Sequence, residues 1–104
     1  MAWVYLAIAG LFEIVWAISM KYADGFTRLW PSAIAIIGMI LSVILLELSL
    51  RDLPVGTAYA VWTGIGTVGA GVLGMVLFQE PATAIRIGSI GLIVCGIAGL
   101  KLFA

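Results

Sequence analysis

The chain has 104 residues, of which 64% are hydrophobic and 10% charged, and its formal net charge is zero. A soluble domain carries about 25% charged residues, so this composition indicates a membrane protein, and the length allows a single domain. The balanced charge gives no indication of a nucleic acid or an anionic surface as partner.

The reactive side chains are few, which narrows the chemistry. There is no histidine, so a pH-dependent step must use a carboxylate. The single cysteine, Cys95, excludes a disulfide within the chain, and with no histidine it argues against a zinc site. We find no nucleophile–base pair and no set of metal ligands, so we expect neither a cofactor nor an enzyme.

The first hydrophobic stretch, residues 2–20, carries one carboxylate near its middle. As a helix it is about 28 Å long, enough to cross a bilayer, and Glu13 is its only charged residue. A charge at that depth costs roughly 3 kcal/mol, and the nearest basic residue is Lys21 at the helix end. Such an acid indicates a functional site by default; a structural acid in a helix contact, or a glutamate of a soluble helix, is the alternative.

Small residues share the helical face of Glu13. Spacings of three and four residues place on this face Leu6, Ala9, Gly10, Trp16, Ala17 and Met20. Gly10 and Ala17 are small, so we expect the face to be open near the carboxylate. A turn at Asp24-Gly25 is predicted in the loop that follows.

The second stretch, residues 30–50, has a serine in its middle and an acid near its end. Ser42 alone is a weak indication, since a lone serine in a membrane helix usually bonds its own backbone. Glu47 precedes Arg51 by four residues, the favourable order for a helical ion pair, so we interpret Glu47 as interfacial and paired. A second transport carboxylate is the alternative. Residues 51–55 form the next loop.

The third stretch, residues 56–78, is an uncharged run of 23 residues with six glycines. The segment 64–69 matches the dinucleotide pattern G-x-G-x-x-G, which we reject because it lies inside a membrane span with no strand before it. Gly66, Ala70 and Gly74 predict a close helix contact. The pair Gly64 and Gly66 predicts a kink, because paired glycines weaken a helix.

The fourth stretch, residues 84–103, contains a second row of small residues. Gly91, Cys95 and Gly99 recur at helical spacing, with Gly88 on roughly the same face. This row predicts a packing seam, either within the chain or between chains. Lys101 is near enough to the end to reach the membrane surface.

Two chains in opposite orientations would complete a site around Glu13 better than one. The end with the N-terminus holds two basic residues and the other end three: Arg51 and Lys101 against Lys21, Arg28 and Arg86. So small a bias permits insertion both ways, which produces the inverted repeat of many transporters. Glu13 lies roughly 60% of the way along its span, and Trp62 of an inverted chain, with Tyr59 on the same face, at about 70%. Inversion therefore brings the partner's aromatic residues toward the carboxylate.

This arrangement suits the exchange of a proton for a cation. A carboxylate in a medium of low dielectric constant favours its protonated form, so a proton and a cation can compete for it. If the site opens to one side at a time, the two fluxes are coupled, and two copies of Glu13 would titrate as a coupled pair. Trp16, Tyr59 and Trp62 offer aromatic faces to a cation, and Tyr59 and Ser42 offer hydroxyl groups.

The chain resembles the small multidrug resistance transporters over essentially its whole length. The resemblance rests on Glu13 in the first helix, GFTRLWPS (25–32), AYAVWTGIG (58–66) and the small-residue fourth helix. Within the family it is similar to the guanidinium exporter subtype, on Gly10, the run E-I-V-W (13–16), LPVGTAYAVWTGIG (53–66) and GLK (99–101). An acid at position 47 departs from the family pattern.

The resemblance implies an all-α membrane protein with four transmembrane helices in one domain, residues 1–104. It implies an antiparallel, dual-topology homodimer in the bacterial inner membrane that exports guanidinium, or a related small cation, in exchange for protons. Glu13 is implied as the proton and substrate site, with lining residues Gly10, Trp16, Ser42, Tyr59 and Trp62. The implied kink is Gly64 and Gly66, and the implied dimer contact is Gly88, Gly91, Cys95 and Gly99. The alternatives are a broader exporter of quaternary ammonium cations and a membrane subunit that does not transport.

Overall fold

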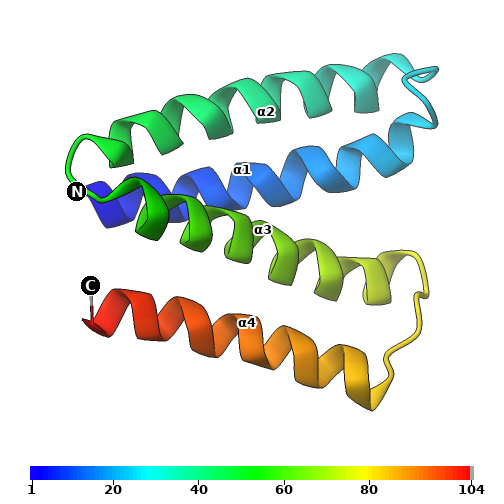
Figure 1. Ribbon diagram of the computed structural model, residues 1–104. Helices are drawn as coiled ribbons and strands as arrows, with labels where there is room; N and C mark the ends of the chain where they lie inside the picture. Colours follow the sequence, from blue (N-terminus) through cyan, green and yellow to red (C-terminus); the bar gives the residue numbers. More distant parts are fainter. Residues whose placement is uncertain (104) are drawn as a thin grey trace.

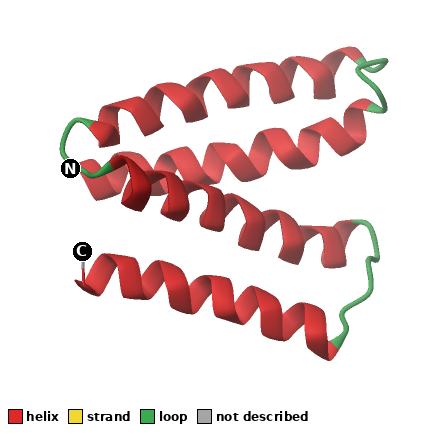
Figure 2. Ribbon diagram, viewed as in Figure 1, coloured by secondary structure: helices red, strands yellow, loops and turns green. Residues whose placement is uncertain are grey.

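The structure, a computed structural model, describes residues 1–103 and contains four helices joined by loops (Figure 1). The helices are α1 (Ala2–Ala23), α2 (Leu29–Leu50), α3 (Val55–Leu77) and α4 (Ala84–Phe103). In the described residues the chain is drawn throughout as helix or loop (Figure 2). Each helix is long and apolar enough to cross a membrane, which confirms the four predicted spans.

The helix boundaries follow the ends of the apolar stretches closely. The largest difference is in α1, which runs on to Ala23 instead of ending at residue 20. It stops where Asp24 takes the left-handed conformation, with φ 49°, followed by Gly25 with φ 72°. This is the predicted turn, and glycine adopts a positive φ without the steric penalty of a side chain.

The four helices lie side by side in a flat layer, in the order α2, α1, α3, α4 (Figure 1). The layer measures 41 × 34 × 16 Å between Cα atoms. Helix α1 packs against α2 and α3, whereas α4 packs mainly against α3. A small core of buried side chains lies between α1, α2 and α3: Leu6, Ala9, Leu46, Ala58 and Val61. The thin layer leaves many apolar side chains outside, as lipid contact permits.

Glycines allow α3 to approach both of its neighbours. On the side of α1, a Cβ atom added to Gly69 would overlap the side chain of Ile14. On the side of α4, a Cβ atom at Gly64 would lie 2.9 Å from Cδ1 of Ile97. The predicted close contact at Gly66 is also with α1, while Gly74 faces Glu80 of the next loop rather than a helix.

The small residues of α4 face away from α3. Helix α4 instead presents larger side chains to the glycines of α3, namely Ile90, Ile93 and Ile97. A Cβ atom added to Gly88, Gly91 or Gly99 would meet no atom within 4 Å in the described chain, and Cys95 is exposed. The predicted packing seam is therefore not a contact within the chain, and a contact between chains stays a prediction.

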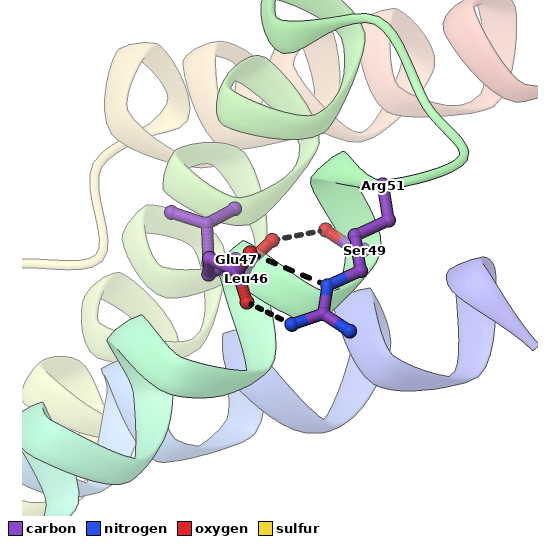
Figure 3. Close-up of polar contacts among 4 residues, drawn as sticks. All are labelled: Leu46, Glu47, Ser49 and Arg51. Carbon is purple, nitrogen blue, oxygen red and sulfur yellow. Dashed lines mark hydrogen bonds and ion pairs between the residues drawn. The ribbon is translucent and has the colours of Figure 1, made fainter.

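Two ion pairs lie at opposite ends of the layer. Glu47 and Arg51 form the predicted pair, with Nε–Oε1 and Nη2–Oε2 distances of 3.3 Å and both side chains exposed (Figure 3). Beside them the Ser49 hydroxyl donates to the Leu46 carbonyl, so this end of α2 is locally satisfied. At the other end, Arg86 donates to Glu80 across the loop before α4, at 2.5 Å. This second pair is not predictable from the sequence, because a six-residue separation across a proline has no regular geometry.

Candidate functional site

Glu13 lies half-buried in the middle of α1 and packs directly on α3. A Cβ atom added to Gly66 would overlap Cγ of Glu13 and lie 3.2 Å from its Cβ. Any side chain at position 66 would therefore have to move the glutamate. Glycine is needed at position 66 because the side chain of Glu13 fills the space where a Cβ atom would lie. Helical spacing alone did not reveal that Gly66 helps to position Glu13.

A chain of hydrogen bonds runs beside this carboxylate. The indole Nε1 of Trp62 donates to Oγ of Ser42 at 2.8 Å. The Ser42 hydroxyl lies 2.7 Å from the Ala9 carbonyl oxygen and 3.5 Å from Oε2 of Glu13. A hydroxyl has one proton to donate, so the shorter bond to Ala9 is the principal one and Glu13 lies at the edge of hydrogen-bonding distance.

This chain of bonds connects three helices through one buried hydroxyl group. Ser42 is on α2, Ala9 on α1 and Trp62 on α3, and Ser42 is fully buried. A lone serine in a membrane helix usually bonds its own helix, but Ser42 bonds the backbone of α1. The sequence predicts Trp62 near Glu13 only through an inverted partner, whereas Ser42 lies between the two residues within one chain.

Trp16 and Tyr59 have polar groups that the chain itself does not use. Nε1 of Trp16 is buried and has no hydrogen-bond partner among the described residues. The Tyr59 side chain is exposed, with its ring centroid 5.4 Å from that of Trp62 and the ring planes tilted by 57°. No hydrogen bond of the Tyr59 hydroxyl is found in residues 1–103. Buried N–H groups without partners are rare, so Trp16 is an exception among the described residues.

The glycines predicted to shape the site serve close packing within the chain. A Cβ atom at Gly10 would lie 2.5 Å from Cγ2 of Ile65, so the space beside this residue is filled by α3 rather than open. Helix α3 continues without a break through Gly64 and Gly66. Both of these glycines are explained by near neighbours, Ile97 and Glu13. Their role as a kink, and that of Gly10 in lining the site, stay predictions.

Glu13 is the one carboxylate placed deep in a helix of the described chain. Glu47 is exposed at the end of α2 and paired with Arg51. Glu80 lies in the loop between α3 and α4 and is paired with Arg86. The structure thus brings together Glu13, Ser42 and Trp62, leaves Tyr59 exposed next to Trp62, and leaves the donor group of Trp16 without a partner.

Comparison with known proteins agrees with this architecture. Residues 1–93 match the model of a family described as Small Multidrug Resistance protein. The chain is 60% identical over 102 residues to a protein of Citrobacter freundii named "Guanidinium exporter", covering 98% of this chain and 97% of that protein. Proteins with the same name from Yersinia pseudotuberculosis serotype I (strain IP32953) and Escherichia coli (strain K12) are 58% and 57% identical, again over 98% of this chain and over 98% and 97% of their own lengths.

The family match and the four apolar helices support one assignment. The matched residues span α1, α2, α3 and about half of α4, including every residue of the hydrogen-bond chain. The chain is accordingly a multi-pass protein of the inner membrane and a transporter. It belongs to the small multidrug resistance protein family.

Proposed function

We propose that the protein exports guanidinium and small substituted guanidinium ions in exchange for protons, with the proton and the cation competing for Glu13. The observation that carries this proposal is the placement of one carboxylate deep in an apolar helix, held against α3 at Gly66 and beside the Ser42–Trp62 hydrogen bond. The name of the relatives, guanidinium exporter, supports the choice of substrate.

The chemistry of the carboxylate explains why guanidinium suits it. Guanidinium is planar and its N–H groups match the two oxygens of a carboxylate in parallel hydrogen bonds. Ser42 approaches only Oε2 of Glu13, at 3.5 Å, so its hydroxyl leaves the other oxygen free. When Glu13 takes up a proton, it loses the charge that attracts the cation and becomes a donor. Binding of the two species is then mutually exclusive.

An antiparallel homodimer completes the site in this proposal. One chain is a layer only 16 Å thick, which leaves Glu13 partly exposed, and a second layer against it would enclose both carboxylates. The outward small residues of α4 provide the contact: Gly88, Gly91, Cys95 and Gly99. Alternating access follows if α3 bends at Gly64 and Gly66.

The proposal separates guanidinium from quaternary ammonium ions. Tetramethylammonium and tetrapropylammonium have no N–H group, so they would leave the carboxylate oxygens of Glu13 without a donor. A site built to hydrogen-bond its substrate discriminates strongly against an analogue that lacks the donor. A broader exporter of quaternary ammonium cations is the second candidate, favoured by the exposed aromatic ring of Tyr59 beside Trp62.

Transport currents in proteoliposomes under one proton gradient test the proposal. We expect guanidinium to give currents, both ammonium ions to give little, and Glu13→Gln to abolish the guanidinium current. Glu13→Asp should retain some activity with an altered pH dependence, because the charge remains on a shorter side chain. Glu47→Gln is the matched control, since that acid is exposed and paired at the end of α2, and it should transport as the unaltered protein does.

Three results would contradict the proposal. Full activity of Glu13→Gln would mean that another group binds the proton and the cation. Currents of equal size for tetrapropylammonium and guanidinium would replace the proposed substrate class with the broader one. The absence of current for every cation, in protein reconstituted alone and shown to be folded, would favour the subunit that does not transport.

A further inference from the structure

An apolar hollow lies at the end of the layer where α1 begins and α4 ends, away from Glu13. It has a volume of about 180 Å³ and is lined by residues of α1, α3 and α4: Trp3, Leu6, Ala7, Val61, Ile65, Ile97 and Lys101. Figure 1 shows that the beginnings of α1 and α3 and the end of α4 lie at this end of the layer. Neither the carboxylate site nor the small residues of α4 contribute to this hollow.

The lining is apolar except for one cation at its outer edge. Nζ of Lys101 lies 4.8 Å from the centroid of the Trp3 ring, a cation–π distance. In the described chain, no carboxylate lies within ion-pair distance of Lys101, whereas the acids of α2 and of the third loop are paired with arginines. An ammonium group has three donors, and an aromatic face uses only part of this capacity. The lysine is therefore available to an anion at the membrane surface.

The order of the lining residues along the helices gives the hollow a direction. Trp3 and Lys101 are within a turn of their helix ends, at the level where tryptophan and lysine meet lipid headgroups. Leu6, Val61 and Ile65 lie progressively deeper in α1 and α3. The hollow therefore has a charged outer edge and an apolar inner part.

The beginning of α1 adds a partial positive charge close to the hollow. Helix α1 begins here without a side-chain cap, so its first N–H groups carry the partial positive charge of a helix N-terminus. Basic pockets between transmembrane helices bind anionic lipid headgroups. In a bilayer, the molecule that joins an anionic phosphate to an apolar chain is a phospholipid.

We propose that this hollow, with Trp3 and Lys101 at its outer edge, is a binding site for an anionic phospholipid. Its phosphate contacts the Lys101 ammonium group above the Trp3 ring, and the first part of one acyl chain lies against Ala7, Ile65 and Ile97, which are not fully buried. The site is independent of the proposed transport function, because none of these residues is assigned to the binding of proton or guanidinium.

Lipid retention measured by native mass spectrometry tests this site. The full-length protein is released from mixed micelles that hold equal amounts of phosphatidylglycerol and phosphatidylcholine, and the retained lipids are counted. One basic residue near an anionic lipid is worth on the order of a five-fold preference. We expect about this preference for phosphatidylglycerol in the unaltered protein and loss of the preference in Lys101→Gln.

Lys21 provides the matched control for charge. Its Nζ lies 5.8 Å from the centroid of the Phe78 ring at the opposite end of the layer, so it also combines a lysine with an aromatic face. It does not line the hollow, and Lys21→Gln should keep the full preference for phosphatidylglycerol. Equal loss in both variants, or no loss in Lys101→Gln, would overturn the proposal.

Ala7→Phe tests the apolar part, because a phenyl group at this position would fill the hollow without changing charge. We expect retention of both lipids to fall while the fraction of dimer stays as it was. A collapse of the dimer with unaltered lipid retention would mean that a second chain covers this surface, which would also overturn the proposal. If the variant does not fold, Lys101→Gln against Lys21→Gln still decides the result.

Discussion

Ser42 holds three helices together through a single hydroxyl group, which makes it a test of the stability of the fold. Replacing it by alanine leaves Nε1 of Trp62 without its acceptor at 2.8 Å. A buried donor without a partner costs about 1–3 kcal/mol, so Ser42→Ala should lower the unfolding temperature in detergent. Ser89→Ala is the control, because the Ser89 hydroxyl is exposed and bonds only Ile85 of its own helix. Equal shifts in the two variants would refute the structural role of Ser42.

The contact between Gly66 and Glu13 predicts that a substitution at position 66 weakens the binding of guanidinium. In Gly66→Ala the added methyl group meets Cγ of Glu13, so the acid must move. Overpacking of this kind costs about 1–3 kcal/mol, and we expect weaker binding of guanidinium by calorimetry at a pH where the unaltered protein binds well. Gly56→Ala, in the same helix with no atom within 4 Å of the added Cβ, should bind normally. Normal binding by Gly66→Ala would show that the position of Glu13 does not depend on Gly66.

For single residues, the sequence identifies which are unusual but not which residues they contact. Glu13 and Ser42 stand out because polar groups are rare in apolar spans, and Trp62 because it is too deep for the aromatic belt. Their mutual contacts depend on how far each helix is rotated about its axis, which a single sequence does not determine. The same limit applies to Gly66, whose spacing predicts close contact but not that a carboxylate is the neighbour.

Among the helices, α4 carries the clearest prediction about assembly. Its small residues face outward, so Gly91→Leu should leave the fold of one chain intact and weaken association of two chains. Val94→Leu is the control, because Val94 is exposed but belongs neither to the small-residue row nor to the contact with α3. The dimer fraction in detergent and in lipid is the measurement. An unchanged fraction in Gly91→Leu would place the interface elsewhere.

The extent of each helix was predictable because length and apolarity are properties of a continuous stretch. Which face of α4 packs against α3 was not predictable. The row of Gly91, Cys95 and Gly99 and the row of Ile90, Ile93 and Ile97 both recur at helical spacing. Either row could have packed against α3. In the structure the isoleucines do so, because their large side chains fill the space beside the glycines of α3. That complementarity is visible only when both helices are placed.

For the whole molecule, the small difference in basic residues predicts insertion in both orientations. Two basic residues at one end against three at the other give almost no orienting bias. Thr27→Cys and Asp52→Cys place labels in loops at opposite ends, in a Cys95→Ala background. We expect an impermeant maleimide to label each position partly from outside the cell and fully after permeabilisation. Labelling of only one of the two positions from outside would establish a fixed orientation and contradict the antiparallel dimer.

Because α4 packs mainly against α3 and meets α1 where Lys101 lies over the Trp3 ring, the fold divides into a three-helix body and a fourth helix beside it. Rotation of the three-helix body against α4 disturbs the α3–α4 contact and the Lys101–Trp3 pair, whereas moving α1 alone would disturb its larger contacts with α2 and α3. Where α3 meets α4, isoleucine side chains pack against glycines, and these apolar contacts have no directional bonds to break. A chain of about a hundred residues can thus keep α4 stationary while the three helices that hold Glu13 tilt. One helix then anchors the protein and the other three move.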